Sequence, residues 1–334
     1  MASAQVPATF AKFVVDKFDI QAEAKTRMSG KPAPFCLLGL NSAAPETVKA
    51  WGTADLVAPG CAVLSNSSNS NGLVTGGTAT MTGAAFCSAG GASGSGFTPA
   101  AKTKCPVQSD PYAGQFTQAA LASKGLIVPG GCNYQSTMRV KNATTINANG
   151  GVITFCGGVN VSAGGTLTLG PGVYVIFNDL TVNSNATLDA RQGTTIILAN
   201  SNWMTGTKDG RIYVFGGGNF LLTAPKSGPT ASMAVLQPSV SNYTGGSTWA
   251  IENTIIGGGK IEIVGNWYSP QAKTRITGSG VINANSSYFA IVSDFVDLEG
   301  NGELHLNAGG DPSLVGMSGV PGQLSSGGHI SLIE

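Results

Sequence analysis

Short apolar runs alternate with glycine or asparagine along residues 137–307. Runs of this length are typical of strands rather than helices, and Gly or Asn between them supplies the positive φ that a tight corner requires. The sequence therefore predicts many short β-strands. The clearest are Val152–Phe155, Thr166–Leu169, Val173–Ile176, Thr194–Leu198 and 260–264.

These strands are too numerous, and too rarely joined by two-residue hairpin turns, for a simple hairpin sandwich. Short strands with frequent corners are typical of a chain that coils and places each turn on the previous one. We therefore predict an all-β fold, a right-handed parallel β-helix (β-solenoid), with a short N-terminal helix and disulfide-linked loops.

Composition along the chain divides it into four predicted regions. Residues 1–35 hold a helix at 7–15 and a half-buried strand at 18–24, and residues 36–136 form a small-residue β region with a long loop at 88–118. Further short strands are expected there around 37–40, 54–57, 61–65 and 78–86. Residues 137–307 form the regular solenoid with a surface excursion at 226–249, and residues 308–334 form a cap or irregular tail.

Six cysteines lie at wide spacings in the first half of the chain, and the only histidines are His305 and His329. No Cys/His spacing suits zinc, whereas an even number of separated cysteines is typical of disulfides in an oxidising compartment. Sequential pairing is preferred among the fifteen connectivities that six cysteines allow. The pairs would be Cys36–Cys61, Cys87–Cys105 and Cys132–Cys156.

The chain has few charged residues, and Ser, Thr and Asn take their place among the polar positions. Charged residues make up 10% of the 334 positions and the net charge is +1, so no basic footprint for nucleic acid or an anionic membrane is present. Residues 1–30 lack the basic-then-apolar pattern of a signal peptide. If the chain is exported, we expect either a targeting signal that is removed before this sequence begins or an export pathway that does not use a signal peptide. Six Asn-x-Ser/Thr triplets are interpreted as corner chemistry rather than glycosylation; they begin at Asn66, Asn142, Asn160, Asn185, Asn242 and Asn285.

A series of segments in a fixed order resembles a known family. Two lie around Cys36–Leu40 and Gly60–Ser67, and the next is Asp110–Ala113; Pro171–Ile176 and Leu222–Pro229 follow. Together they resemble the extracytoplasmic part of TadE/TadG-like proteins of bacterial Tad (Flp) pili. The resemblance covers roughly residues 6–306, although the family usually has an N-terminal transmembrane helix that this sequence does not show.

The resemblance implies a structural or adhesive role at the cell surface or in pilus assembly. It implies no cofactor and carries no catalytic residue onto any position of this chain. Other pilus or cell-envelope proteins are the implied partners, and surface glycans and self-association are further candidates. The implied location is extracellular or at the cell surface, with passage through the periplasm.

A polysaccharide-degrading enzyme is the main rival because many parallel β-helices cleave such polymers. That chemistry needs paired carboxylates, or acids with nearby bases, on neighbouring turns. Asp294 and Asp297 are three positions apart and are expected on opposite faces of a strand. Asp179, Asp189 and Arg191 could meet across turns, and a solvated corner pair is the favoured interpretation.

A flat binding surface is the third class, for ice or for carbohydrate. Thr166 and Thr168 begin a Thr-x-Thr pattern that lapses elsewhere. Aromatic side chains could form a platform for a partner, with Trp203, Trp249, Trp267 and Tyr268 as candidates, or they could fill the core. We expect a non-enzymatic surface protein without cofactor or metal. The two alternatives are a protein that binds ice or carbohydrate and an enzyme that degrades polysaccharides.

Overall fold

The computed structural model describes residues 2–6, 18–22, 26–28, 34–128, 131–199, 210–238, 251–279, 281–283, 286–307 and 330–332. The chain divides into two units, Met1–Pro32 with Gln323–Glu334, and Ala33–Gly322. In the first unit β1 (Ala2–Val6) pairs antiparallel with β2 (Phe18–Ala22), and β3 (Thr26–Met28) pairs antiparallel with β28 (Ile330–Leu332). The expected helix at 7–15 lies outside the described residues. Within the predicted cap or irregular tail at 308–334, the described residues Ile330–Leu332 form a strand, paired with β3.

The second unit is nearly all β, and its described strands form one long sheet with parallel pairing. From β11 to β21 each strand pairs with the strand three elements further along the chain, and elsewhere, where the longer strands β6, β8, β24 and β26 each contribute to more than one stack, pairs are mostly two elements apart. The strands therefore fall into three stacks. This pattern is compatible with an all-β solenoid and confirms the prediction of short parallel strands. Val152–Phe155, Thr166–Leu169 and Thr194–Leu198 are strands with the predicted bounds.

The three stacks are defined by their pairing. The first contains β11 (Met138–Val140), β14 (Val159–Val161), β17 (Leu180–Val182), β20 (Ile212–Val214), β23 (Glu252–Ile256), the last parts of β24 (Ile261–Thr277) and β26 (Phe289–Gly300), β5 (Val48–Gly52), β7 (Leu73–Gly77) and β9 (Ala92–Ser93). The second contains β12 (Thr144–Ile146), β15 (Thr166–Leu169), β18 (Thr187–Ala190), β21 (Asn219–Thr223), the start of β24, β25 (Val281–Ile282), β27 (Glu303–His305), the starts of β6 (Asp55–Ser65) and β8 (Thr80–Ser88), and β10 (Phe97–Thr98). The third contains β13 (Val152–Phe155), β16 (Gly172–Ile176), β19 (Thr194–Leu198), β22 (Met233–Leu236), the middle of β24, the start of β26, β4 (Phe35–Gly39) and the ends of β6 and β8.

Burial follows the apolar pattern differently in these stacks. In the first two, apolar and polar positions alternate, so β15 and β18 bury every second residue. In the third stack all five residues of β19 and all four of β22 are buried. Continuous apolar runs are typical of strands covered on both faces, whereas alternation is typical of strands with one face in solvent. The sequence pattern therefore distinguishes the covered stack from the solvent-facing ones.

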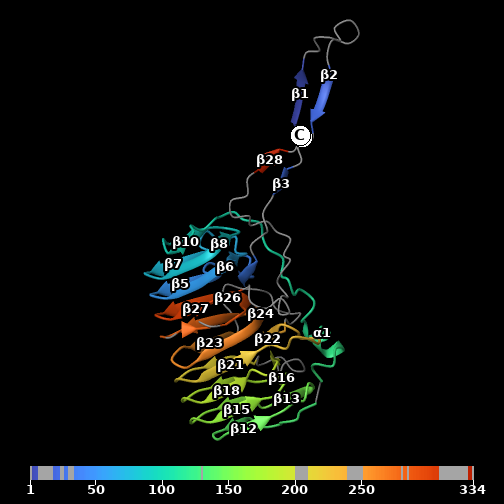
Figure 1. Ribbon diagram of the computed structural model, residues 1–334, viewed down its shortest axis with the longest axis vertical. Helices are drawn as coiled ribbons and strands as arrows, with labels where there is room; N and C mark the ends of the chain where they lie inside the picture. Colours follow the sequence, from blue (N-terminus) through green and yellow to red (C-terminus); the bar gives the residue numbers. More distant parts are fainter. Residues whose placement is uncertain are drawn as a thin grey trace. The chain divides into compact units, whose positions relative to one another are not determined.

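Strands from the beginning and the end of this unit are neighbours in the sheet. The start of β26 pairs with β4, its end pairs with β5, and β27 pairs with β6. In Figure 1 the blue strands β5 and β6 accordingly lie beside the orange strands β26 and β27, and β21, β18, β15 and β12 follow in this order on the other side of β26 and β27. The regions 36–136 and 137–307, distinguished by composition, thus contribute to one sheet. We call this contact of β26 and β27 with β4, β5 and β6 the junction.

Glycines make the corner beside the first stack across this junction. Gly300, Gly52 and Gly77 have φ of 90°, 86° and 69°, a region that side chains with a Cβ rarely adopt. A Cβ on Gly52 would lie 2.9 Å from the carbonyl oxygen of Gly300. Only glycine therefore allows these corners to stack directly on one another.

A return connection leads from β10 to β11 and includes the helix α1 (Gln118–Ser123). Thr117 caps this helix, because its Oγ1 accepts a hydrogen bond from the backbone nitrogen of Ala120 at 3.1 Å. The prediction of a loop at 88–118 is wrong for β9 and β10, whose residues extend the sheet. The predicted excursion at 226–249 is likewise wrong for β22, because its apolar residues are buried in the third stack; 239–250 lie outside the described residues.

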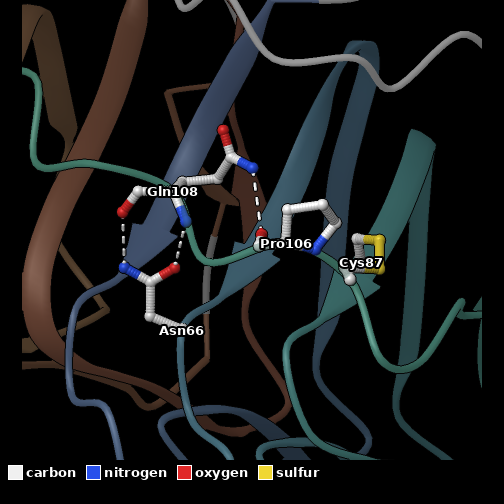
Figure 2. Close-up of a disulfide and its surroundings, with 5 residues drawn as sticks. Asn66, Cys87, Pro106 and Gln108 are labelled. Atoms are coloured by element: carbon white, nitrogen blue, oxygen red, sulfur yellow. Dashed lines mark hydrogen bonds between the residues drawn. A yellow bond between two sulfur atoms is a disulfide. The ribbon is translucent and has the colours of Figure 1, made fainter.

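Reciprocal amide bonds hold the start of this connection to β6 (Figure 2). Asn66 Oδ1 accepts a hydrogen bond from the backbone nitrogen of Gln108, and Asn66 Nδ2 donates one to the Gln108 carbonyl, both at 2.8 Å. Gln108 Nε2 in turn donates to the carbonyl of Pro106, next to the Cys87–Cys105 disulfide. The Asn66 side chain is buried and hydrogen-bonded, which favours a structural role for this Asn-x-Ser triplet.

Three disulfides join Cys36 to Cys61, Cys87 to Cys105 and Cys132 to Cys156. The preferred sequential pairing is therefore confirmed. Such bonds persist in oxidising compartments and indicate an extracellular or periplasmic environment. Among the described residues, no helix has the length and apolar character needed to cross a bilayer.

Replacing both Cys36 and Cys61 by serine should lower the free energy of unfolding by about 3 kcal/mol, because a loop of this length loses substantial entropy when it is closed. Their sequence separation is 25. Urea unfolding followed by circular dichroism measures the change. The Cys132/Cys156 double serine variant, with a sequence separation of 24, is the matched control and should lose a similar amount. An unchanged urea midpoint in both variants would contradict this account.

Candidate functional site

Charged side chains gather on the solvent-facing side of the first stack at the junction. In the register of this stack Arg275 of β24 is opposite Asp297 of β26, and Asp297 is opposite Lys49 of β5. In β5 the alternating pattern buries Val48 and leaves Lys49 on the other face. Alternation along three neighbouring strands therefore brings basic and acidic groups together from distant parts of the chain. We call this group the junction cluster; it consists of Glu46, Lys49, Glu252, Lys273, Arg275, Asp297 and Glu299.

Asp297 is the most deeply placed acid of the junction cluster, with 3% of its surface exposed. Its Oδ2 lies 2.5 Å from Lys273 Nζ, and its Oδ1 lies 3.4 Å from Lys49 Nζ. The Lys273 residue is 7% exposed, so both members of this pair have left bulk water. Buried charges are tolerated when opposite charges and hydrogen bonds replace hydration.

Glu299 links the two outer cations of the cluster. Its Oε1 accepts from Lys49 Nζ at 2.8 Å and its Oε2 accepts from Arg275 Nη2 at 2.7 Å. Glu252 of β23 adds a second acid, 3.5 Å from Arg275 Nη1. Four strands that are not all consecutive in the chain are thus joined by ion pairs as well as by backbone hydrogen bonds.

Burial and pairing act differently on the two central acids. Burial raises the pKa of Asp297, because the loss of hydration outweighs the effect of Lys273 and Lys49. Burial also opposes ionisation of Glu299, but hydrogen bonds from Lys49 and Arg275 outweigh it and lower the pKa to about 2. Glu299 is therefore ionised across the physiological range.

Trp51 lies beside the junction cluster on the same face of β5. It is opposite Glu299 on one side and Gly76 of β7 on the other. Half of its surface is exposed, at 50%. Sequence reasoning singled out neither Trp51 nor Lys49, although the alternation Val48-Lys49-Ala50-Trp51 indicates that both share the outer face.

The junction cluster is suited to holding strands together and to presenting fixed charges. Each of its carboxylates lies within ion-pair distance of a base from its own or a neighbouring strand. Among the residues that the structure describes, no group of three or more His, Cys, Asp or Glu side chains is arranged to hold a metal ion. His305 pairs with Glu303 at 2.8 Å, and His329 lies outside the described residues.

The acids considered for catalysis have separate partners. Asp294 accepts a hydrogen bond from Asn41 Nδ2 at 3.2 Å, whereas Asp297 faces Lys273. The expectation that Asp294 and Asp297 do not form a pair therefore agrees with their different partners. Arg191 binds Asp189 through two hydrogen bonds of 2.9 and 2.7 Å.

Asp179 does not join the Asp189–Arg191 pair in the structure. Its Oδ1 lies 3.3 Å from Nε of Arg211, the residue directly before β20. Both pairs are substantially exposed, as expected for solvated corner pairs.

The proposed aromatic platform is wrong for the two members that the structure describes. Trp267 is completely buried and Tyr268 is 2% exposed. Both belong to the third stack, where strands are covered on both faces, and Trp267 Nε1 donates to Ser269 Oγ at 3.2 Å. Trp203 and Trp249 lie outside the described residues.

Tyr268 instead anchors the return connection. Its hydroxyl donates to Asp110 Oδ2 at 2.8 Å, and the ring of Tyr112 meets it edge-on with centroids 5.2 Å apart. Phe116 lies 6.0 Å from the same ring. Burial, followed by the charge of Asp110, raises the pKa of Tyr268. The phenol is therefore a neutral donor that fixes the connection over the third stack.

The comparisons with known proteins yield no relative. No family model, no curated protein and no solved structure matches this chain. The geometry of the site and the segments quoted above therefore carry the functional argument.

Replacing Asp297 by asparagine should destabilise the fold by about 3 kcal/mol, because the buried Lys273 would lose its near counterion and keep only Glu252, whose Oε2 is 3.8 Å away. Asp189→Asn is the matched control and should cost less than about 1 kcal/mol, since its ion pair is exposed. Urea unfolding measures both. Equal losses in the two variants would contradict the importance of the buried pair.

Stability at acid pH should depend on Glu299. Its pKa of about 2 in the fold lies below the ordinary value of 4.5, so its contribution is present above pH 4.5 and is lost as the pH falls towards 2. Between these values the free energy of unfolding should fall more steeply in the wild type than in Glu299→Gln. Glu262→Gln, which removes an acid paired with the exposed Lys260, is the control. Parallel pH curves for wild type and Glu299→Gln would refute this assignment.

Proposed function

We propose that this chain is a non-enzymatic structural or adhesive protein of the bacterial cell surface, of the Tad pilus type. Its role is to present a stiff, disulfide-stabilised β-structure to other envelope proteins or to surface glycans. One observation carries the proposal: the acids of the junction cluster are engaged in ion pairs that join strands.

The proposed architecture is a right-handed parallel β-helix. Three stacks of parallel strands, with pairing between elements three apart from β11 to β24, support it. Parallel crossovers between strands of one sheet are right-handed in about 98% of cases, which favours this hand. A column of backbone-bonded turns resists bending, because each turn is paired on both sides.

The segments that carry the resemblance have structural roles that suit a scaffold. Cys36 and Cys61 bond to each other across neighbouring strands, and Asp110 and Tyr112 dock the return connection on Tyr268. These roles support a rigid framework in a surface protein without implying an active site. The disulfides support export to an oxidising compartment.

The ice-binding alternative finds little support in the second stack. Thr166 and Thr168 lie opposite Thr187 and Asp189. On the next turns the corresponding positions are Asn219 and Leu221, and then Lys260 and Glu262. A flat threonine ladder therefore does not continue beyond two turns there.

Deleting the gene from a bacterium that makes this chain should reduce attachment of the cells to surfaces, and the wild-type gene should restore it. The Cys36/Cys61 double serine variant should restore less, because fewer folded molecules would reach the surface. Surface proteolysis of intact cells, read by immunoblot, checks the location. Full attachment in the deletion strain, or protection of the chain from external protease, would refute the proposal.

The enzymatic alternative predicts that the purified chain degrades polysaccharides, whereas the proposed function predicts that it does not. Pectin- and alginate-like polymers incubated with the purified chain should keep their length. Depolymerisation by the wild type that is absent in Asp294→Asn would overturn the non-enzymatic assignment.

A further inference from the structure

Trp51 is an unusual side chain for the outer face of this sheet. Large apolar side chains with substantial exposure are few in the described residues: Trp51, Val107, Val128 and Tyr213. Trp51 is the one tryptophan among them, and it stands on a regular strand, β5, rather than on a connection. An exposed tryptophan on a rigid element is typical of a binding contact, because its large ring orders at little entropic cost.

The indole ring of Trp51 packs against Gly76 of the neighbouring strand β7. A Cβ placed on Gly76 would lie 2.1 Å from both Cε3 and Cζ3 of Trp51, so the six-membered part of the ring covers the position where a side chain would project. One ring face therefore lies on the backbone of β7, and the exposed half of the side chain is available to a ligand. Gly76 and Trp51 together form a flat apolar surface about one ring wide.

Polar groups border this surface on the side of β26. Glu299 is the register partner of Trp51, and strands in a sheet lie about 4.8 Å apart. Its side chain is 26% exposed and that of Arg275 is 37% exposed. Lys49 and Arg275 both hold the Glu299 carboxylate, so these hydrogen-bonding groups are fixed in place rather than free to rotate.

We propose that Trp51, lying on Gly76 and beside Glu299, whose carboxylate Arg275 holds, is a carbohydrate-binding site that stacks one neutral pyranose ring of a surface glycan. The apolar face of a sugar ring fits a single indole, and its equatorial hydroxyls fit fixed charged donors and acceptors at one edge. This inference rests on the adhesive form of the proposed function and names its ligand class.

The surroundings favour a sugar over a protein partner. A protein interface buries a wide apolar centre, whereas here one ring is bordered by charged groups on the same face. The cluster contains three bases, Lys49, Lys273 and Arg275, against four acids, so it offers no excess positive charge for an acidic glycan. Neutral sugars are therefore the expected class.

The test uses the full chain and soluble neutral oligosaccharides, namely hexamers of glucose, xylose, mannose and N-acetylglucosamine in β-linkage. Isothermal titration should detect binding of at least one of them by the wild type. Trp51→Ala should weaken that binding about tenfold or more, since the stacking contact is lost. Gly76→Ala should also weaken it, because the new methyl group displaces the ring while the tryptophan remains.

Tyr213→Ala is the matched control, since it removes an exposed aromatic side chain of the first stack away from the junction. It should leave affinity unchanged, and urea unfolding should show that all three variants fold. Binding of none of the four sugars, or equal affinity in wild type and Trp51→Ala, overturns the site. If the sugars do not bind but the deletion strain loses attachment, the proposed function stands and the sugar site is refuted. If the sugars bind through Trp51 but the deletion strain still attaches, the sugar site stands and the proposed role in attachment is refuted.

Discussion

Parallel backbone pairing between neighbouring strands of each stack is the constraint on which the second unit depends. Each strand satisfies its amide and carbonyl groups through the turns on either side, so every turn needs a neighbour. The strands β4 to β6 provide that neighbour for β26 and β27, even though they come from the opposite end of the unit. Covering an edge in this way converts an open end into sheet interior.

The junction also carries the network of ion pairs formed by the junction cluster. Backbone pairing alone does not select which strand meets β26, but the buried pair of Lys273 with Asp297 and the bonds from Lys49 to Glu299 match one register. A register shift would leave these charges buried and unpaired, which costs several kcal/mol for a buried ion. The ion pairs therefore specify the junction, and the glycine corners at Gly52 and Gly300 permit its close approach.

The covered third stack and the solvent-facing first stack carry different kinds of contact. The third stack is buried on both sides, and Tyr268 holds the return connection there through Asp110 and Tyr112. The first stack faces outward and carries Trp51 next to fixed charges. A rigid element with one covered face and one face that carries exposed polar and aromatic groups supports the proposal of a surface protein that binds its partners.

Local pattern determined the strand class and several strand bounds, because apolar periodicity acts over short distances. Sequential cysteine pairing was a preference among fifteen connectivities, and the structure confirmed it. The sequence left open whether Trp267 and Tyr268 form a surface platform or fill the core, and the structure buries both. Only the tertiary structure decided that Lys49 meets Glu299 across 250 positions and that Trp51 lies on Gly76. Those contacts follow from which turn stacks on which, and that choice depends on edges formed by residues far apart in the chain.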